Sequence, residues 1–198
     1  MSDAPAISGC RTAAIGPGRL ILVVGPSGAG KDTLLRLARA ACADESNVVF
    51  ARRVVTREAS AFEDNEQVSH DAFRRALAQD AYSAHWQAHG HYYALPRTID
   101  DEVRAGRSVI ANVSRTVVGA MRRAYADVVV VAITAPPQVL AERLAMRARD
   151  SDGRIEQRLG RRVDDAAAVP DITIMNVSSA EYHARQFVRI IKGDRWNE

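Results

Sequence analysis

The chain has 198 residues, 47% of them hydrophobic and 26% charged, with two cysteines and a formal net charge of +3. This length and composition suit one globular domain, the cysteines imply no disulfide framework, and no apolar run reaches the length of a membrane span. The two cysteines suit a reducing cytoplasm, so we expect a cytoplasmic protein. The positive charge is too small to indicate a nucleic-acid partner but fits small anionic ligands, and we expect no membrane partner. The sequence predicts no oligomeric state.

The first predicted elements surround a glycine-rich turn. Residues 1–18 contain small and polar residues without an apolar stretch, so we expect a flexible extension that is not a signal peptide. The apolar run 20–24 predicts a buried strand, and apolar residues at helical spacing follow the turn. The turn matches the pattern G-x-x-x-x-G-K, which between a strand and a helix indicates a phosphate-binding loop. The residues predicted to bind ATP are Gly25, Pro26, Ser27, Gly28, Ala29, Gly30, Lys31, Asp32 and Thr33.

Asp32 stands where most phosphate-binding loops have serine or threonine, whose hydroxyl binds Mg²⁺. A carboxylate is a hard oxygen ligand, so Asp32 can hold Mg²⁺ directly. The alternative is that an acid in the first turn of a helix is favoured by the helix dipole and has no metal role. We favour the metal role, with ATP as co-substrate and Mg²⁺ as cofactor.

Two elements are predicted between the loop helix and the middle of the chain. The valine-rich stretch 47–55 predicts a second strand. A polar, irregular stretch follows, and Ser69 is placed to cap a helix that ends near Ala78.

A hairpin and a short helix are predicted next. The aromatic stretch 82–95 is β-prone and is interrupted by His89 and Gly90, which indicates a turn between two strands. Thr98, with Asp101 three residues later, resembles a capping box at the start of a helix.

The second half of the chain alternates between strands and helices. An unbroken apolar run such as 128–133 is typical of a strand buried on both faces of a parallel sheet. The predicted order is strand 108–113, helix 116–125, strand 128–133, a helix from 136, strand 172–175 and helix 180–192. This alternation predicts an α/β fold with a parallel sheet flanked by helices and a site at the carboxyl ends of the strands.

Three groups of residues fall in loops or at strand ends, where sites are built. Arg53, Thr56 and Arg57 suit an acceptor phosphate, because an arginine pair can clamp it, although a solvated strand end is the alternative. The aromatic segment 86–93 either lines the binding site of a small polar substrate or forms the core of a small subdomain. The arginines of 143–162 predict a cationic lid over the phosphates, with a salt-bridged surface helix as the alternative.

These pieces resemble the guanylate-kinase-like branch of the nucleoside monophosphate kinases over residues 19–192, which implies a P-loop NTPase fold followed by a tail at 193–198. The resemblance rests on the loop 25–31, Thr56-Arg57, Tyr92-Tyr93, the lid arginines of 143–149 and Asn176. It implies an acceptor-binding region at about 53–97, a lid at about 143–162 and an ATP contact from Asn176.

Four segments that differ from guanylate kinases resemble the ribose 1,5-bisphosphate phosphokinases of phosphonate degradation. They are Gly30–Asp32, Thr56–Ala61, Trp86–Tyr93 and Asn112–Arg115. The resemblance implies phosphoryl transfer from ATP to ribose 1,5-bisphosphate, which gives ADP and 5-phospho-α-D-ribose 1-diphosphate. The acids that guanylate kinases carry after the third core strand are missing here, while Asp32 is an added acid, which is consistent with a relocated Mg²⁺ ligand. Ala94 and Ala148 stand where glycine is usual, which affects the expected loop geometry rather than the reaction.

The pattern and the resemblance together assign roles to named residues. The residues assigned to catalysis are Lys31, Asp32, Arg143, Arg147, Arg149 and Arg158. Those assigned to acceptor binding are Arg53, Thr56, Arg57, His89, Tyr92, Tyr93, Asn112, Ser114 and Arg115. Two alternatives stay open: a guanylate or other nucleoside monophosphate kinase, and a guanylate-kinase-like interaction module without catalytic activity.

Overall fold

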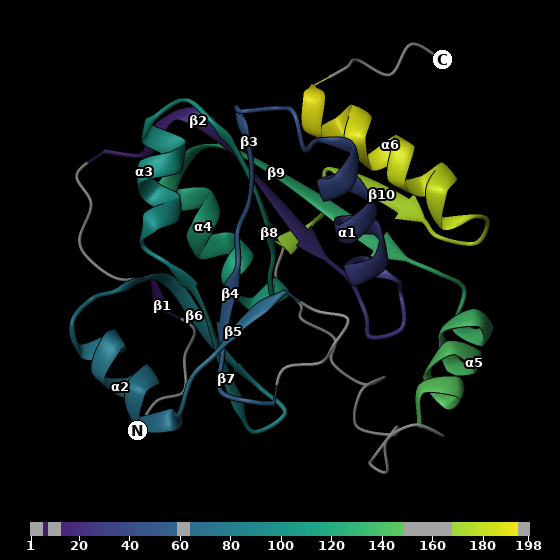
Figure 1. Cartoon of the computed structure of the whole chain (residues 1–198), viewed down its shortest axis with the longest axis horizontal. Coiled ribbons are helices and arrows are strands. Elements are labelled where there is room, and N and C mark those ends of the chain that lie inside the picture. The colour runs from purple at the N-terminus through teal and green to yellow at the C-terminus, as the bar shows by residue number, and fades with distance from the viewer. Residues whose placement is uncertain (1–5, 8–12, 59–63, 149–167, 194–198) are drawn as a thin grey trace.

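Parallel strands form the central sheet. The computed structural model of the chain describes residues 6–7, 13–58, 64–148 and 168–193 (Figure 1). Within these residues the sheet has the order β10-β9-β2-β8-β3, and every pair is parallel. Its strands are β2 (Ile15–Val24), β3 (Val48–Phe50), β8 (Ser108–Asn112), β9 (Tyr125–Thr134) and β10 (Ile172–Met175). With helices on both faces, this sheet confirms the predicted α/β fold.

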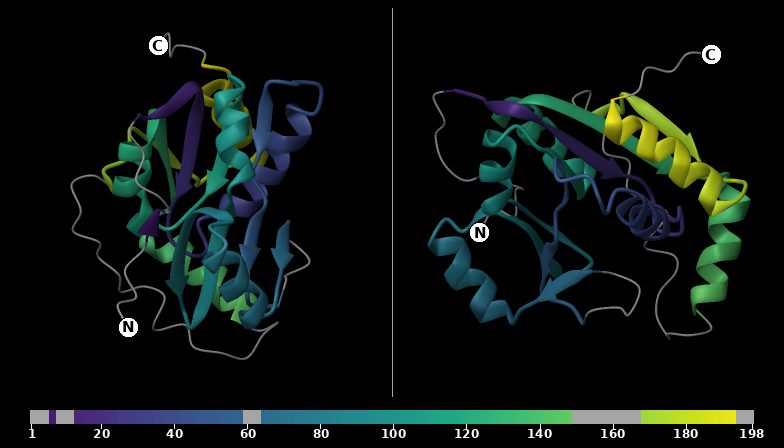
Figure 2. Two further views of the ribbon diagram at one scale, coloured as in Figure 1. Left: turned by 90° about the vertical axis from the view of Figure 1, so that its left-hand side faces the viewer. Right: turned by 45° about the horizontal axis from the view of Figure 1, so that its top comes forward.

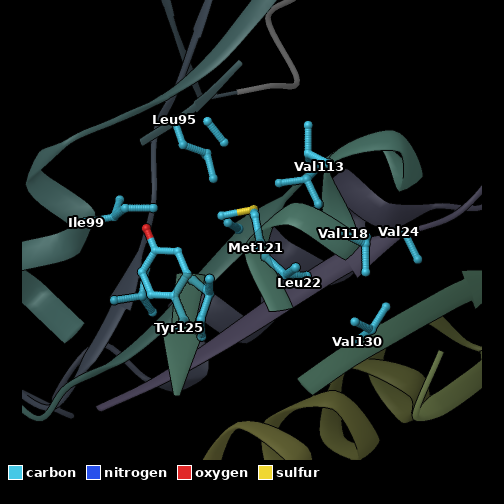
Figure 3. Close-up of a cluster of buried hydrophobic side chains, with 14 of the residues drawn as sticks. Leu22, Val24, Leu95, Ile99, Val113, Val118, Met121, Tyr125 and Val130 are labelled. Atoms are coloured by element: carbon cyan, nitrogen blue, oxygen red, sulfur yellow. The ribbon is translucent and has the colours of Figure 1, made fainter. Parts of the chain in front are cut away.

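Alternate residues of β2 point to opposite faces of the sheet and build two cores. Leu20, Leu22 and Val24 pack in one core with helices α3 (Thr98–Arg104) and α4 (Val118–Ala124), part of which Figure 3 shows. Ile21 and Val23 pack in the other core with α1 (Lys31–Ala41) and α6 (Ala180–Lys192). Figure 1 shows the two helix pairs on opposite sides of the sheet. The unbroken apolar run in β2 therefore reflects burial on both faces.

A second, mostly antiparallel sheet has the order β1-β6-β7-β4-β5. Its strands are β1 (Ala6–Ile7), β4 (Arg53–Val55), β5 (Asn65–Gln67), β6 (Tyr82–Ala88) and β7 (His91–Pro96). Helix α2 (His70–Ala78) covers it through Phe73, which packs with Val54, Tyr82 and Ala94. The right-hand view of Figure 2 shows α2 at the opposite end of the molecule from α6.

Two predictions in this second sheet are confirmed. Strands β6 and β7 form the expected hairpin, with His89 and Gly90 in its turn. The Ser69 hydroxyl accepts a hydrogen bond from the Ala72 amide at 3.1 Å, and α2 ends at Ala78 as expected. Both features depend on residues close together in the chain, so local sequence suffices to predict them.

The prediction of one strand over 47–55 is wrong, because the stretch forms two strands in two different sheets. Strand β3 pairs with β8 in the parallel sheet, whereas β4 pairs with β7 in the second sheet. Between them, the Ala51 amide donates to the Ile110 carbonyl at 2.8 Å before the chain leaves the first sheet. Val54 and Val55 are buried after the crossing. Continuous β-prone sequence indicates burial but gives no sign of which sheet supplies it.

The N-terminal segment differs from the expected extension. Strand β2 begins at Ile15, and Ala6–Ile7 pairs with His85 and Ala84 of β6. These parts of 1–18 therefore belong to the two sheets. Their pairing is made by backbone groups, which a search for apolar runs does not detect.

Two helix boundaries also differ. Arg97 precedes α3, Thr98 is its first residue, and no side chain caps that end, so the predicted capping box is wrong. Helix α4 ends at Ala124, and Tyr125 begins β9 instead of closing the helix. No helix in the described ranges is long and apolar enough to cross a membrane.

A buried carboxylate explains the position of Tyr125. The Asp100 side chain is fully buried and accepts hydrogen bonds from the Ser83 hydroxyl at 2.7 Å and the Tyr125 hydroxyl at 2.6 Å. Ser83 lies in β6, Asp100 in α3 and Tyr125 at the start of β9, so the network joins the two sheets through a helix. A buried charge is tolerated only when such partners satisfy it.

Tyr125→Phe should lower the free energy of unfolding by about 1.5–3 kcal/mol, because it removes a hydrogen bond to a buried charged group with little change of volume. Urea denaturation measures the effect. Tyr182→Phe is the control, since Tyr182 is 48% exposed and its change should stay within about 0.5 kcal/mol. Equal stabilities of the two variants would contradict a structural role for the Asp100 network.

Candidate active site

The glycine-rich turn after β2 packs closely against its surroundings. At two of its glycines there is no space for a side chain. Gly25 has φ +148°, and a Cβ there would lie 2.0 Å from the Ile133 carbonyl oxygen. Gly30 has φ +85°, and a Cβ there would lie 2.4 Å from the Asn176 amide nitrogen. Both positions therefore require glycine on steric and conformational grounds. The turn delivers the chain to the start of α1 at Lys31.

Positive charge gathers at this turn. The Lys31 ammonium donates hydrogen bonds to the carbonyl oxygens of Gly25 and Pro26, each at 2.9 Å, so it lies against the turn. The N-terminus of α1 adds the partial positive charge of its backbone amides. Backbone amides, a helix N-terminus and an ammonium together form a site for an anionic ligand such as a polyphosphate.

Arg143 and Asn176 brace the turn from the side of β10. Arg143, in α5 (Pro137–Ala148), donates to the Asn176 carbonyl at 3.1 Å and to the Gly28 carbonyl at 3.4 Å. The Asn176 side chain is buried and donates to the Ala29 carbonyl at 2.8 Å. Both residues therefore contact the backbone of the turn, and these contacts hold the turn in its conformation.

A pocket of about 270 Å³ lies along α1 and begins at Asp32, the second residue of that helix. One wall is a face of α1, because Asp32, Leu35, Arg36 and Arg39 recur at the helical spacing i, i+3, i+4 and i+7. The opposite wall comprises the crossing between the two sheets and the start of β5, and the end of β8 supplies the remainder. Its lining beyond α1 comprises Phe50, Ala51, Arg53, Asp64, Asn65, Ile110 and Asn112.

Asp32, Arg53 and Asn112, predicted separately from the sequence, meet in this pocket. The Asn112 amide donates to Asp32 Oδ1 at 3.1 Å, and Arg53 Nη2 lies 4.0 Å from the same oxygen. Arg53 Nε also donates to Asn65 Oδ1 at 3.2 Å, which fixes the guanidinium. A carboxylate next to Lys31 is therefore oriented by an amide and balanced by an arginine.

A second ion-pair group lies at the outer end of the pocket. Asp64 accepts a hydrogen bond from Arg39 and pairs with Arg52 Nε at 2.9 Å. The hydrogen bond from Arg39 holds the pKa of the Asp64 carboxyl below its usual range, so this acid stays ionised near neutral pH. The Arg39 guanidinium also lies 5.5 Å from the centre of the Phe50 ring. These contacts join α1 to the second sheet.

Asp32 fits a Mg²⁺ site that has few protein ligands, which is the usual kind of Mg²⁺ site in proteins. Among the described residues, no group of three or more His, Cys, Asp or Glu side chains is arranged to hold a metal ion. Mg²⁺ is commonly held by one or two carboxylates, with water and substrate phosphates as its other ligands. One oriented carboxylate beside a phosphate-binding turn meets that requirement.

Other predicted acceptor residues lie in the second sheet and have structural partners there. The Thr56 hydroxyl accepts from the Tyr92 amide at 2.9 Å, which joins β4 to β7. The Tyr92 ring stacks on Phe73 with 5.5 Å between ring centres. Tyr93 is buried and stacks on Trp86 with 5.7 Å between ring centres. These aromatic side chains build the subdomain, which is the second of the two interpretations of segment 86–93, and none of them lines the pocket.

The pocket lining also lacks four other predicted acceptor residues, His89, Arg57, Ser114 and Arg115. His89 lies in the hairpin turn. The Ser114 hydroxyl accepts a hydrogen bond from the Thr116 amide at 3.4 Å, and Arg115 is exposed in the short helical turn that follows. Arg57 donates to the Glu58 carbonyl at 3.0 Å. Arg147 belongs to α5, whereas Arg149 and Arg158 lie outside the described residues.

Sequence reasoning missed the pocket residues Arg36, Arg39, Asp64 and Asn65. The two arginines were detectable, because their spacing from Asp32 places all three on one face of the predicted helix. Asp64 and Asn65 carried no such signal, since they reach the pocket only through the pairing of β5 with β4.

Comparisons with known proteins agree with this geometry. A family model described as AAA domain matches residues 21–164. The ribose 1,5-bisphosphate phosphokinase PhnN of Bradyrhizobium diazoefficiens is 62% identical over 100% of both chains, and that of Rhodopseudomonas palustris is 61% identical over 93% of both. Guanylate kinase from Anaplasma phagocytophilum has a similar fold, with a TM-score of 0.61 and 22% identity over 91% of this chain and 87% of that one.

A parallel sheet whose first long strand leads into a phosphate-binding turn defines a P-loop fold, and with relatives named phosphokinases at over 60% identity the class is a P-loop kinase. Full-length identity above 60% then gives the particular group. The chain belongs to the ribose 1,5-bisphosphate phosphokinase family.

Proposed function

We propose that this protein transfers the γ-phosphoryl group of ATP to the 1-phosphate of ribose 1,5-bisphosphate, which gives ADP and 5-phospho-α-D-ribose 1-diphosphate, in phosphonate catabolism. The observation that carries the proposal is the position of Asp32, which follows the phosphate-binding turn and Lys31 in the chain and lines a pocket that also contains three arginines. The names of two relatives, 62% and 61% identical over 100% and 93% of this chain, support the same reaction.

The donor and the acceptor are assigned to opposite sides of Asp32. The turn 25–30 and Lys31 hold the phosphates of ATP, and Arg143 and Asn176 keep the turn in shape. Arg53, Arg57 and Arg115 hold the acceptor, with Arg53 the member of this set that lines the pocket. The arginines at 147, 149 and 158, expected from the sequence to close over the donor, stay a prediction.

The chemistry needs alignment and charge stabilisation more than proton transfer. An oxygen of the acceptor 1-phosphate bonds to the γ-phosphorus while the bond from that phosphorus to the β–γ bridging oxygen breaks, and ADP leaves with the bonding electron pair. The attacking phosphate is largely ionised at neutral pH, so no strong general base is required. Lys31 and the arginines stabilise the charge that spreads over the moving group. Mg²⁺, when bound at Asp32, supplies further neutralisation of phosphate charge.

Phosphorus NMR of a reaction with ATP and ribose 1,5-bisphosphate tests the proposal. We expect the signals of ADP together with a new coupled pair from a diphosphate on the first carbon of the sugar. GMP is the comparison acceptor, because guanylate kinase shares the fold. A clear preference for GMP would replace the proposal with a nucleoside monophosphate kinase. Failure to bind ATP in calorimetry would favour the inactive interaction module.

A further inference from the structure

We propose that Arg36 binds the 5-phosphate of the sugar bisphosphate, about one turn of α1 beyond Asp32 in the pocket. This inference rests on the proposed function and deepens it by assigning the second phosphate of the acceptor to a residue of α1. Arg36 would then determine specificity, because it distinguishes a bisphosphate from a sugar that carries only the reacting phosphate.

The geometry of α1 places Arg36 at a suitable position. Asp32 and Arg36 lie on one helical face, and both line the pocket. Four residues of α-helix span about 6 Å along the axis, which is the order of the distance between phosphates on opposite sides of a pentose. The reacting 1-phosphate must lie near Lys31 and Asp32, where the donor phosphate is held. The 5-phosphate therefore points away from the turn and along α1.

The three arginines of the pocket differ in how far they are engaged. Arg39 donates to Asp64 and, at 3.4 Å, to the Phe50 carbonyl. Arg53 donates to Asn65 and lies close to Asp32. For Arg36, the described part of the chain shows neither a hydrogen bond nor an ion pair, and the side chain is exposed. Its guanidinium is the one whose donors are not committed to a described neighbour.

The size and the walls of the pocket favour a sugar phosphate over a nucleotide. A volume of about 270 Å³ is small for a ligand site. The lining contains three arginines but only one aromatic ring, Phe50, and Arg39 lies over that ring. Among these residues, no aromatic ring is available for a purine to stack on, because Arg39 lies over Phe50. A second phosphate can instead bind the Arg36 guanidinium, whose planar geometry suits bidentate hydrogen bonding.

The test compares Arg36→Gln with the wild type on two acceptors, ribose 1,5-bisphosphate and ribose 1-phosphate. We expect kcat/KM for the bisphosphate to fall about 10- to 30-fold, as for the loss of a charge-assisted hydrogen bond. The value for ribose 1-phosphate and the KM for ATP should change less than about twofold, because neither ligand reaches Arg36. Where ribose 1-phosphate turns over too slowly, its inhibition constant against the bisphosphate replaces kcat/KM.

Arg185→Gln is the matched control, since Arg185 is an exposed arginine of α6 and its replacement makes the same change of charge. Arg115→Gln tests the rival position for the 5-phosphate. Equal losses on both acceptors, no loss with Arg36→Gln, or a changed preference in Arg115→Gln instead would overturn the inference and leave the proposed function intact. A wild-type protein that does not phosphorylate the bisphosphate would overturn both.

Discussion

Lys31→Ala should lower kcat by about 100- to 1,000-fold, because it removes a full positive charge from the phosphate-binding turn. The Lys31 ammonium lies against the backbone of the turn, where the helix N-terminus contributes only a partial charge. Neutralising the phosphates during transfer therefore depends on this side chain more than on any backbone amide. Steady-state kinetics at saturating ATP and acceptor measures the change.

The chain supplies a natural control for this substitution, since Lys192 is its only other lysine. Lys192 forms an ion pair with Glu45 at the end of α6, and surface pairs of this kind contribute about 0–1 kcal/mol. Lys192→Ala should therefore keep normal turnover and nearly normal stability. Circular dichroism separates catalysis from folding for both variants. A folded Lys31→Ala protein with wild-type kcat would contradict the role of the turn in phosphate binding.

Elements that depend on local pattern were predictable from the sequence. The run in β2 gave a strand buried on both faces, because alternate side chains feed two cores. Ser69 and the turn at His89 and Gly90 were also placed correctly, as were β10 and α6. The crossing between β3 and β4 was not predictable, since the valines on either side of it have the same local character and differ only in the sheet that they join.

The geometry of the candidate active site was predictable where one motif specifies it and less so where residues distant in sequence assemble it. Lys31 and Asp32 follow from the spacing of the turn, which specifies backbone conformation and charge together. Tyr93 shows the limit, because an aromatic residue beside a candidate site has the same sequence signature whether it faces ligand or core, and here it is buried. The pairing of β5 with β4 brings Asp64 to the pocket, where it forms ion pairs with Arg39 and Arg52, and no spacing along the chain reveals these contacts.

Asp32→Asn should lower kcat/KM for ATP about 100-fold and raise the Mg²⁺ concentration for half-maximal activity at least about tenfold, because an amide oxygen is a much weaker ligand than a carboxylate. The substitution preserves the size of the side chain and an oxygen that accepts from Asn112. Asp32→Ser restores the hydroxyl that most phosphate-binding loops use, so its Mg²⁺ requirement should be intermediate. A second readout is the rise in melting temperature that Mg²⁺ causes in the presence of ATP, which should shrink in both variants.

The competing explanation of Asp32 is that it only complements the dipole of α1. Asp71 provides the control, because it is the second residue of α2 as Asp32 is of α1. A dipole effect alone costs about 0.3–1 kcal/mol, so Asp71→Asn should lose that much stability and leave the Mg²⁺ requirement unchanged. If Asp32→Asn and Asp32→Ser behaved in the same way as Asp71→Asn, Asp32 would be a structural acid. The metal role requires that substitution of Asp32 raises the Mg²⁺ concentration for half-maximal activity and that substitution of Asp71 does not.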